Sequence, residues 1–159
     1  LPFADGSVDC IILQHSLLNI PDTHTCLTEC RRVLSPGGSL LLHEVLQGPH
    51  PEQMRYPVPW ATSQGHSHLI SIDSLTATLN ACGFHCTVAN NWSEEALAWR
   101  QRQSDKENSP TAAQTASPLS PHQILGEQFR EMGPNVMRNL TSGAVEVWEV
   151  VATPMVSGL

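Results

Sequence analysis

The chain has 159 residues, of which 40 % are hydrophobic and 14 % are charged. This length corresponds to one domain with one core of moderate size. A formal net charge of −7, without a cluster of Lys or Arg, argues against nucleic acid as the main partner. No apolar run reaches the length of a membrane span. The chain starts at Leu1 without a visible signal peptide, so we expect a fragment of a soluble protein of the cytoplasm or an organelle.

The five cysteines give little support for a disulfide framework or a metal site. They stand at positions 10, 26, 30, 82 and 86, and an odd number in a chain of this length favours a reducing compartment. Cys26 and Cys30 have i,i+4 spacing, whereas structural zinc sites more often show C-x2-C. Both fall on the apolar stripe of an expected helix, so we interpret them as buried structural residues and predict no metal ligand. A metal-binding protein that uses the Cys and His residues stays a weaker alternative.

The first half of the chain predicts a strand, a helix and a second strand. Residues 8–13 form a short, branched apolar run, typical of a strand covered on both faces. Asp22 is a suitable N-cap for an amphipathic helix that continues to Leu34. We expect Pro36 and the two following glycines to end this helix in a turn. Residues 40–46 predict the next strand, and together the three elements form a right-handed βαβ crossover.

The second half predicts alternating elements around one insert. Residues 47–70 hold four prolines and form a loop too long to be a simple connector. Residues 104–121 are rich in Ser, Pro, Thr and Ala without an apolar period, and predict a disordered insert. The other expected elements are a helix over 72–82 capped by Ser71 and ended by Gly83, a strand over 85–89, a short helix from 93, helical turns between 124 and 140 ended by Gly143, and a last strand over 144–152.

Two motifs together resemble a known enzyme family. The first is L-P-F-A-D-G-S-V-D at residues 1–9, and the second is E-x-x-R-V-L-S-P-G-G at residues 29–38. Their order, with strands after each, resembles class I S-adenosylmethionine-dependent methyltransferases, within them the ubiquinone/menaquinone-type and sarcosine/dimethylglycine-type branches. The resemblance is strong over residues 1–46. A weaker resemblance to small-amine N-methyltransferases lies in Y-P-V-P-W-A at 56–61 and N-V-M-R-N-L-T-S-G at 135–143.

The resemblance also implies that part of the domain is absent. Such enzymes carry a glycine-rich turn after their first strand and an acidic residue at the end of the second, and neither is found here. The only adjacent glycines, Gly37 and Gly38, follow the expected helix. Residues 1–159 therefore resemble a partial α/β domain, the C-terminal part of a Rossmann-like methyltransferase sheet. In family terms the strand order 3-2-1-4-5-7-6 is reduced to 4-5-7-6, with parallel strands and an antiparallel last strand.

The resemblance and the rule that ligands bind beyond the carboxyl ends of strands select the candidate site residues. By resemblance, Phe3, Gln14 and Ser16 would contact the cofactor S-adenosylmethionine. His15 is the candidate catalytic residue, as a base or an orienting hydrogen-bond partner, because an unperturbed histidine titrates near neutral pH. A satisfied polar group at a strand end is the alternative for His15. The candidate substrate-binding residues are Asn19, His43, Tyr56 and Trp60.

These expectations define one function and one rival. We expect methyl transfer from S-adenosylmethionine to a small-molecule acceptor, with an amine as one option, in the complete parent protein, and an inactive isolated chain. The alternative is a truncated or degenerate methyltransferase that acts as a non-catalytic binding module. The first strand would have an exposed apolar edge. We therefore expect it to pair either with the missing N-terminal half or with a second copy of the chain.

Overall fold

The computed structural model describes residues 1–107 and 122–155, which form two compact units. Of the described residues, the first unit holds 1–47, 68–92 and 146–155, and the second holds 48–67, 93–107 and 122–145. In chain order the helices and strands are β1 (Val8–Gln14), α1 (Thr23–Val33), β2 (Leu34–Gln47), α2 (Ile72–Ala81), β3 (Phe84–Asn91), α3 (Ser93–Glu107), α4 (His122–Leu125), α5 (Phe129–Ser142) and β4 (Val145–Pro154).

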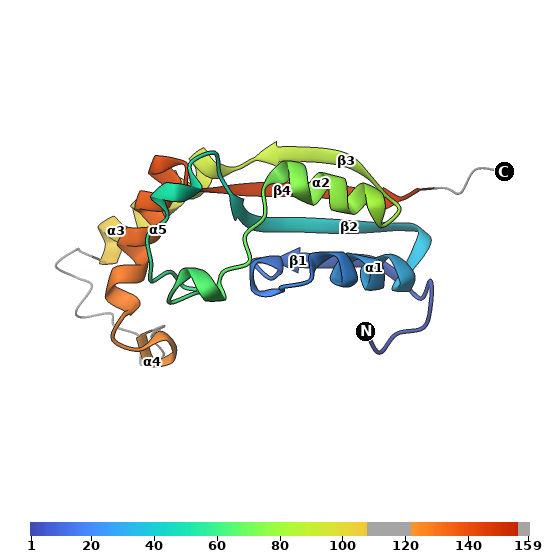
Figure 1. Cartoon of the computed structure of the whole chain (residues 1–159), viewed down its shortest axis with the longest axis horizontal. Helices are drawn as coiled ribbons and strands as arrows, with labels where there is room; N and C mark the ends of the chain where they lie inside the picture. The colour runs from blue at the N-terminus through green and yellow to red at the C-terminus, as the bar shows by residue number, and fades with distance from the viewer. Residues whose placement is uncertain (108–121, 156–159) are drawn as a thin grey trace. The chain divides into compact units, whose positions relative to one another are not determined.

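The first unit is built on a four-stranded sheet with the order β1-β2-β4-β3. Strands β1 and β2 are parallel, whereas β3 and β4 are antiparallel. Figure 1 shows that β4 runs against the other three strands. The predicted α/β fold and its antiparallel last strand are thus confirmed, and the observed order matches the expected 4-5-7-6. Strand β1 forms one edge of this sheet, where Ile12 is 67 % exposed.

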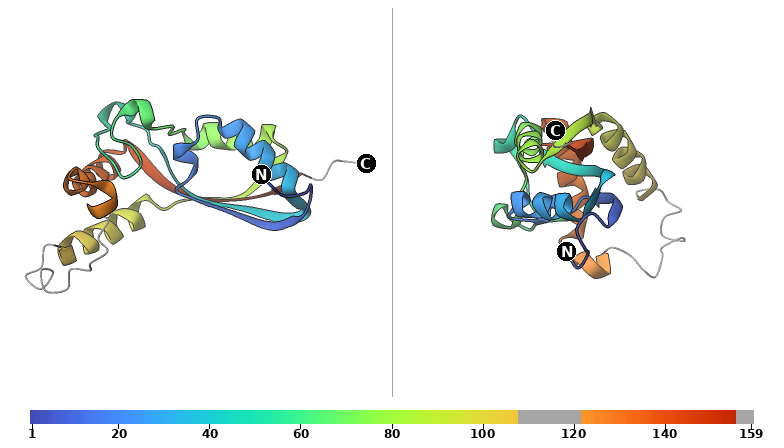
Figure 2. Two further views of the ribbon diagram at one scale, coloured as in Figure 1. Left: turned by 90° about the horizontal axis from the view of Figure 1, so that it is seen from below. Right: turned by 90° about the vertical axis from the view of Figure 1, so that its right-hand side faces the viewer.

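Helices α1 and α2 cover one face of the sheet (Figure 2). Each begins at the predicted cap, because Asp22 Oδ1 accepts a hydrogen bond from the Thr25 amide at 2.9 Å, and Ser71 Oγ accepts one from the Ser74 amide at 3.2 Å. Their apolar faces pack on the sheet and form the core of this unit. Its fully buried members include Leu27, Leu40, Leu75, Leu79, Phe84 and Val150.

The predicted turn at residues 35–38 is wrong, because these residues already belong to β2. Val8 pairs with Leu34 and Cys10 pairs with Ser39, so the ladder holds a bulge at this point. Gly38 makes the close approach possible. A Cβ atom there would lie 2.8 Å from the Leu34 side chain and 2.9 Å from the backbone oxygen of Asp9. The glycine is required for space and not for a positive φ, and only the folded register reveals this contact.

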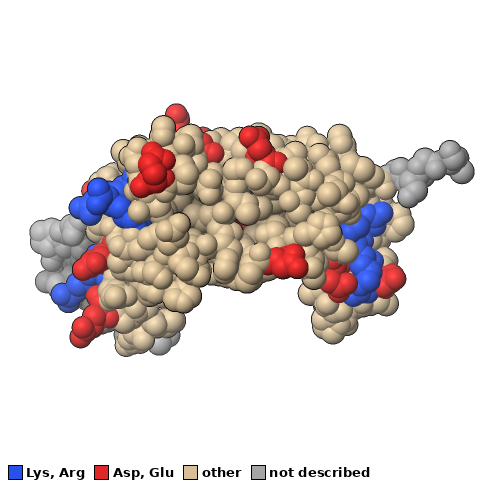
Figure 3. Space-filling view, viewed as in Figure 1, with Lys and Arg blue, Asp and Glu red and all other residues tan. Residues whose placement is uncertain are grey.

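The segment before β1 is fastened to the last turn of α1 by Arg32. Its Nη1 atom donates to the Phe3 carbonyl at 3.0 Å and to Asp5 Oδ1 at 2.6 Å. Glu29 accepts from the same guanidinium at 2.8 Å, and this contact, together with a hydrogen bond from the Leu1 amino group, lowers the pKa of Glu29 to about 2. Figure 3 shows that the basic side chains visible on that face of the molecule lie near acidic side chains.

The second unit contains the long loop and α5. The loop over 48–67 includes two short 3-10 helices, Pro51–Gln53 and Gln64–His66, and an isolated bridge between Val58 and Ala61. Helix α5 ends at Gly143, which adopts φ +71° as predicted for a helix stop.

Two buried amides on α5 hold the loop. Asn139 Oδ1 accepts from the Arg55 amide at 2.8 Å, while Asn139 Nδ2 donates to the Arg55 carbonyl at 2.9 Å. One turn earlier, Asn135 Nδ2 donates to the Pro57 carbonyl at 3.0 Å. Both side chains are buried, and we call this pair the amide clamp. It is why residues 135–143 adjoin the Y-P-V-P-W-A segment.

Helix α3 is longer than the sequence pattern indicates. Residues 104–107, which the composition assigns to the insert, continue α3 to Glu107, and α3 packs on α5. The remainder of the predicted insert lies outside the described residues. Within the two described ranges, no helix combines the length and hydropathy needed to cross a membrane.

Candidate active site at the carboxyl ends of β1 and β2

The candidate site begins where β1 ends. His15 follows the strand with φ +49°, and in the described chain it is the only non-glycine residue with positive φ. Its amide donates to the His43 carbonyl of β2 at 2.9 Å. The backbone therefore turns sharply out of the sheet at His15, in a conformation that L-residues rarely adopt. Backbone strain of this kind is often found at functional sites, where surrounding contacts hold it in place.

Glu44 supplies the contacts that hold this turn. Its carboxylate is fully buried and accepts hydrogen bonds from the Ser16 amide at 2.9 Å to each oxygen. It also accepts from Ser16 Oγ at 3.0 Å and from the Leu17 amide at 3.2 Å. A buried carboxylate needs such partners, because burying an unpaired charge is very costly. Glu44 therefore fixes the backbone that follows His15.

His15 and His43 form a stacked pair at the strand ends. Their ring centroids are 5.2 Å apart with an interplanar angle of 13°, and His15 Nε2 lies 3.2 Å from His43 Nδ1. The Trp92 ring stands edge-on to His43, with centroids 6.4 Å apart. His15 is exposed, His43 is half-buried and Trp92 is 42 % exposed. A single proton between the two nearest ring nitrogens makes one ring the donor and the other the acceptor.

The surroundings favour the neutral form of His15. Partial burial lowers the pKa of His15 below the ordinary histidine value of 6.5, and the nearby His43 lowers it further, while Glu44 opposes both effects. At neutral pH the ring thus keeps a lone pair that can accept a proton or a hydrogen bond. That property suits a general base or an orienting group.

The structure brings together only part of the predicted site set. Gln14, His15, Ser16 and His43 meet at the strand ends, and exposed Asn19 follows in the 3-10 helix Leu17–Asn19. Phe3 instead lines an apolar cavity of about 580 Å³ along α1 and β1. Tyr56 and Trp60 belong to the second unit. There Tyr56 is half-buried and Trp60 Nε1 donates to Ser67 Oγ at 3.1 Å.

The strand-end rule also selects Glu44, with the expectation that at most one of His43 and Glu44 points into the site. It does not predict that Glu44 holds the turn, and it does not select Trp92. Strand alternation sends Glu44 and His43 to opposite faces of β2, yet both contact the 15–17 turn: His43 touches His15 while Glu44 binds Ser16. One signal was available, because a carboxylate inside the apolar run L-L-L-H-E-V-L requires buried hydrogen-bond donors. Trp92 carries no such signal, since it reaches His43 only through the folded sheet.

The cysteines show the chemistry of buried thiols. Cys30 is fully buried in the core, and burial raises its pKa to about 12. Burial also raises the pKa of half-buried Cys26. Both thiols therefore stay protonated at neutral pH and are poor metal ligands or nucleophiles. Within residues 1–107 and 122–155, no group of three or more His, Cys, Asp or Glu side chains is placed to hold a metal ion.

Comparison with known proteins is consistent with this geometry. Residues 1–42 match the family model described as "Methyltransferase domain". The chain is 47 % identical over 47 residues to the demethylmenaquinone methyltransferase of Bacillus velezensis, a match covering 30 % of this chain and 20 % of that protein. It is 43 % identical over 51 residues to the ubiquinone/menaquinone biosynthesis C-methyltransferase of Hahella chejuensis, covering 32 % of this chain and 20 % of that protein.

Solved structures extend the similarity over almost the whole chain. A candidate sarcosine dimethylglycine methyltransferase from Galdieria sulphuraria superposes with a TM-score of 0.75 at 16 % identity, covering 98 % of this chain and 56 % of that one. The chain has the class I methyltransferase fold. Geranyl diphosphate C-methyltransferase from Streptomyces coelicolor, solved with S-adenosyl-L-homocysteine, shares this fold with a TM-score of 0.69 at 14 % identity, covering 98 % of this chain and 49 % of that one.

The class I methyltransferase fold gives the strand-end residues their context. The chain spans about half the length of these two structures. In open α/β sheets of this kind, ligands bind beyond the carboxyl ends of the strands. The turn over Gln14–Ser16 lies at this edge, and both Gln14 and His15 are exposed there.

Proposed function

We propose that this chain contributes the acceptor-side strand ends of an S-adenosylmethionine-dependent methyltransferase acting on a small molecule. The observation that carries the proposal is the turn at His15, held against β2 by buried Glu44 at the carboxyl ends of two parallel strands. The short matches to quinone-biosynthesis methyltransferases over the first third of the chain support it. So do solved relatives with bound S-adenosylmethionine or its homocysteine product.

The turn fits one side of the cofactor. Exposed Gln14 would bind the methionine part, next to Ser16, whose backbone amide is held by Glu44. When bound, S-adenosylmethionine supplies a methyl group on a sulfonium for in-line displacement. The protein then contributes mainly proximity and orientation. Phe3, which resemblance assigns to the cofactor, lies in the segment fastened by Arg32.

His15 has the properties required to handle the acceptor. Its lowered pKa leaves the ring neutral near pH 7, so it can accept the proton that an amine, phenol or carbon acid loses. His43 stacks on the ring and fixes its plane. Asn19 is proposed to contact the acceptor. Tyr56 and Trp60 stay substrate-binding predictions from the resemblance, and their ring faces would suit a cationic amine.

A non-catalytic binding module is the second candidate. One observation favours it: the printed sequence holds neither a glycine-rich turn after a strand nor an acidic strand end that could bind the ribose. A chain of this kind would keep the fold and the strand-end turn while binding S-adenosylmethionine very weakly.

A radiolabelled methyl-transfer assay and calorimetry on the whole product of the coding region, where that is longer, separate the two candidates, because only the enzyme should bind the cofactor well and transfer methyl groups. The 159-residue chain alone is titrated as well. We expect the 159-residue chain alone to bind S-adenosylmethionine very weakly. Micromolar binding would overturn the interpretation that the chain is a partial domain without the other half of the cofactor site. In the active product, His15→Ala should lower turnover at least about tenfold while cofactor affinity changes little. The matched control, His24→Ala, replaces an exposed helix histidine. Unchanged turnover in His15→Ala would return His15 to a structural role.

A further inference from the structure

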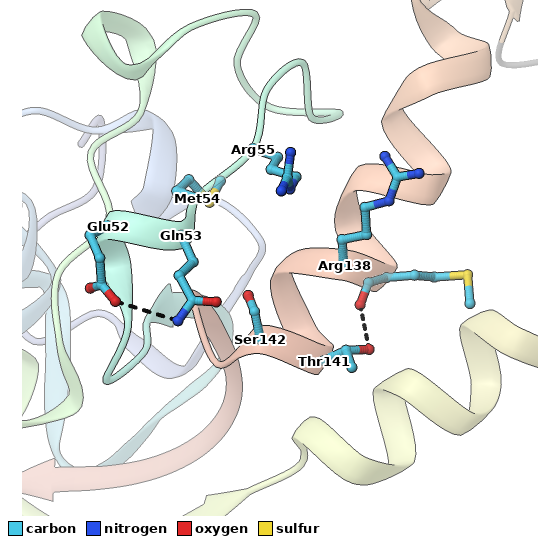
Figure 4. A pocket seen from close by; sticks show the side chains of 8 residues that line it. Glu52, Gln53, Met54, Arg55, Arg138, Thr141 and Ser142 are labelled. Carbon is cyan, nitrogen blue, oxygen red and sulfur yellow. Dashed lines mark hydrogen bonds between the residues drawn. The ribbon is translucent and has the colours of Figure 1, made fainter.

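A second pocket lies within the second unit, between the loop after Pro51 and the C-terminal half of α5. Its volume is about 1090 Å³, slightly above the usual range for small-molecule sites. Figure 4 shows side chains from both elements around it. Because each wall belongs to the same unit, the pocket can be described from that unit alone.

Two arginines give the pocket its character. Arg55 comes from the loop and Arg138 from α5, and Figure 4 shows both guanidinium groups on the same side of the pocket. Both residues are exposed. Among the described residues, neither guanidinium has a carboxylate within ion-pair distance, whereas Arg32 in the first unit has two. The pocket therefore presents two guanidinium groups that no carboxylate in the described part of the chain pairs with.

The amide clamp makes this arrangement rigid. Asn139 holds the Arg55 backbone through two hydrogen bonds, and Arg138 is its immediate neighbour on α5. The backbone positions of the two arginines relative to each other are thus fixed by a buried side chain. Such preorganisation lowers the entropic cost of binding a ligand with two points of attachment.

The side of the pocket away from the two guanidinium groups carries different side chains, from the same two elements. Glu52 and Gln53 lie away from the two arginines in Figure 4. The Thr141 hydroxyl donates to the Met137 carbonyl at 2.8 Å and the Ser142 hydroxyl donates to the Asn139 carbonyl at 3.3 Å. The Thr141 oxygen therefore keeps its acceptor capacity, whereas the Ser142 oxygen already accepts from the Ala144 amide at 3.4 Å and keeps part of it. A ligand would find cationic donors on one side and acceptors, including the Glu52 carboxylate, on the other.

We propose that this pocket binds a small molecule with a phosphate group, held by Arg55 and Arg138, and with a hydroxyl or amino donor facing Glu52. Each guanidinium can bind two oxygens side by side. A carboxylate has only two oxygens, whereas a phosphate has enough to engage both guanidinium groups. The site is separate from the strand-end turn at His15, so this inference goes beyond the proposed function and does not rest on it.

Calorimetric titration of the 159-residue chain with inorganic phosphate tests the proposal. We expect saturable binding with a Kd of about 1 mM or below, and at least about tenfold weaker binding in both Arg55→Gln and Arg138→Gln. The matched control is Arg102→Gln, which removes an exposed arginine of α3 outside the pocket and should bind as the parent does. Circular dichroism confirms that the variants keep the fold.

Three outcomes would overturn the inference. They are the absence of saturable phosphate binding, equal binding by the pocket variants and the parent, and an equal loss in Arg102→Gln. Acetate tests the choice of phosphate over carboxylate, because a carboxylate can form the side-by-side pair of hydrogen bonds with only one guanidinium at a time. We expect acetate to bind at least about tenfold more weakly, and equal affinity would refute the assignment of phosphate.

Discussion

Glu44 offers the sharpest test of how the strand-end turn is held. In Glu44→Ala, the Ser16 amide, the Ser16 hydroxyl and the Leu17 amide all lose their acceptor. Each unsatisfied buried donor costs about 1–3 kcal/mol. Donors in one network do not add fully, so we expect a total loss of about 3–5 kcal/mol in the free energy of unfolding. Glu44→Gln should cost less, about 1–3 kcal/mol, because one oxygen remains while the new amide group faces a donor.

Urea unfolding of the two variants measures these losses. For a chain of this length each kcal/mol lowers Tm by about 2–4 °C, so Glu44→Ala should melt roughly 10 °C below the parent. Glu127→Ala is the control, because Glu127 is exposed and its removal should change the free energy by less than about 0.5 kcal/mol. A Glu44→Ala variant as stable as this control would refute the argument that the carboxylate organises the turn.

Three further predictions follow from single contacts. Gly38→Ala should lose about 1–3 kcal/mol of stability in denaturant titration, because its Cβ would clash with the Leu34 side chain and the Asp9 backbone oxygen. Gly37→Ala has open space around its Cβ and should lose less than half as much. Equal losses in the two variants would contradict this argument. By NMR titration, His15 should show a pKa below 6.5 that rises in His43→Ala. Because the folded state favours the neutral ring, the contribution of His15 to protein stability is complete above pH 6.5 and is lost as the pH falls through the folded pKa. A measured His15 pKa above 6.5 would contradict this prediction. Asn139→Ala should cost about 2 kcal/mol and speed proteolysis of the 48–67 loop, and an unchanged cleavage rate would show that the clamp does not hold it.

Local signals predicted much of the fold. Asp22 and Ser71 cap their helices because a short polar side chain before an apolar stripe meets unpaired amides of the first turn. Gly83 and Gly143 end theirs with positive φ. The strand order came from the resemblance, since the same topology could not be deduced from periodicity alone.

Long-range contacts explain what the sequence did not show. Pro36 and its neighbours are typical of a turn, but pairing with β1 draws them into β2. The positive φ of His15 depends on Glu44 and His43, which lie about 28 residues away in the chain. The same is true of Arg55 and Asn139, 84 residues apart. No local sequence pattern indicates either contact.

The amide clamp recognises the loop through its backbone alone. Asn139 binds the amide and carbonyl of residue 55, and Asn135 binds the carbonyl of residue 57, so neither reads the side chain at 55. That side chain can therefore be exchanged without weakening the attachment of the loop to α5. Position 55 is thus a site where ligand preference can be redesigned at little cost in stability. The loop backbone stays in place while its side chain at this position is changed.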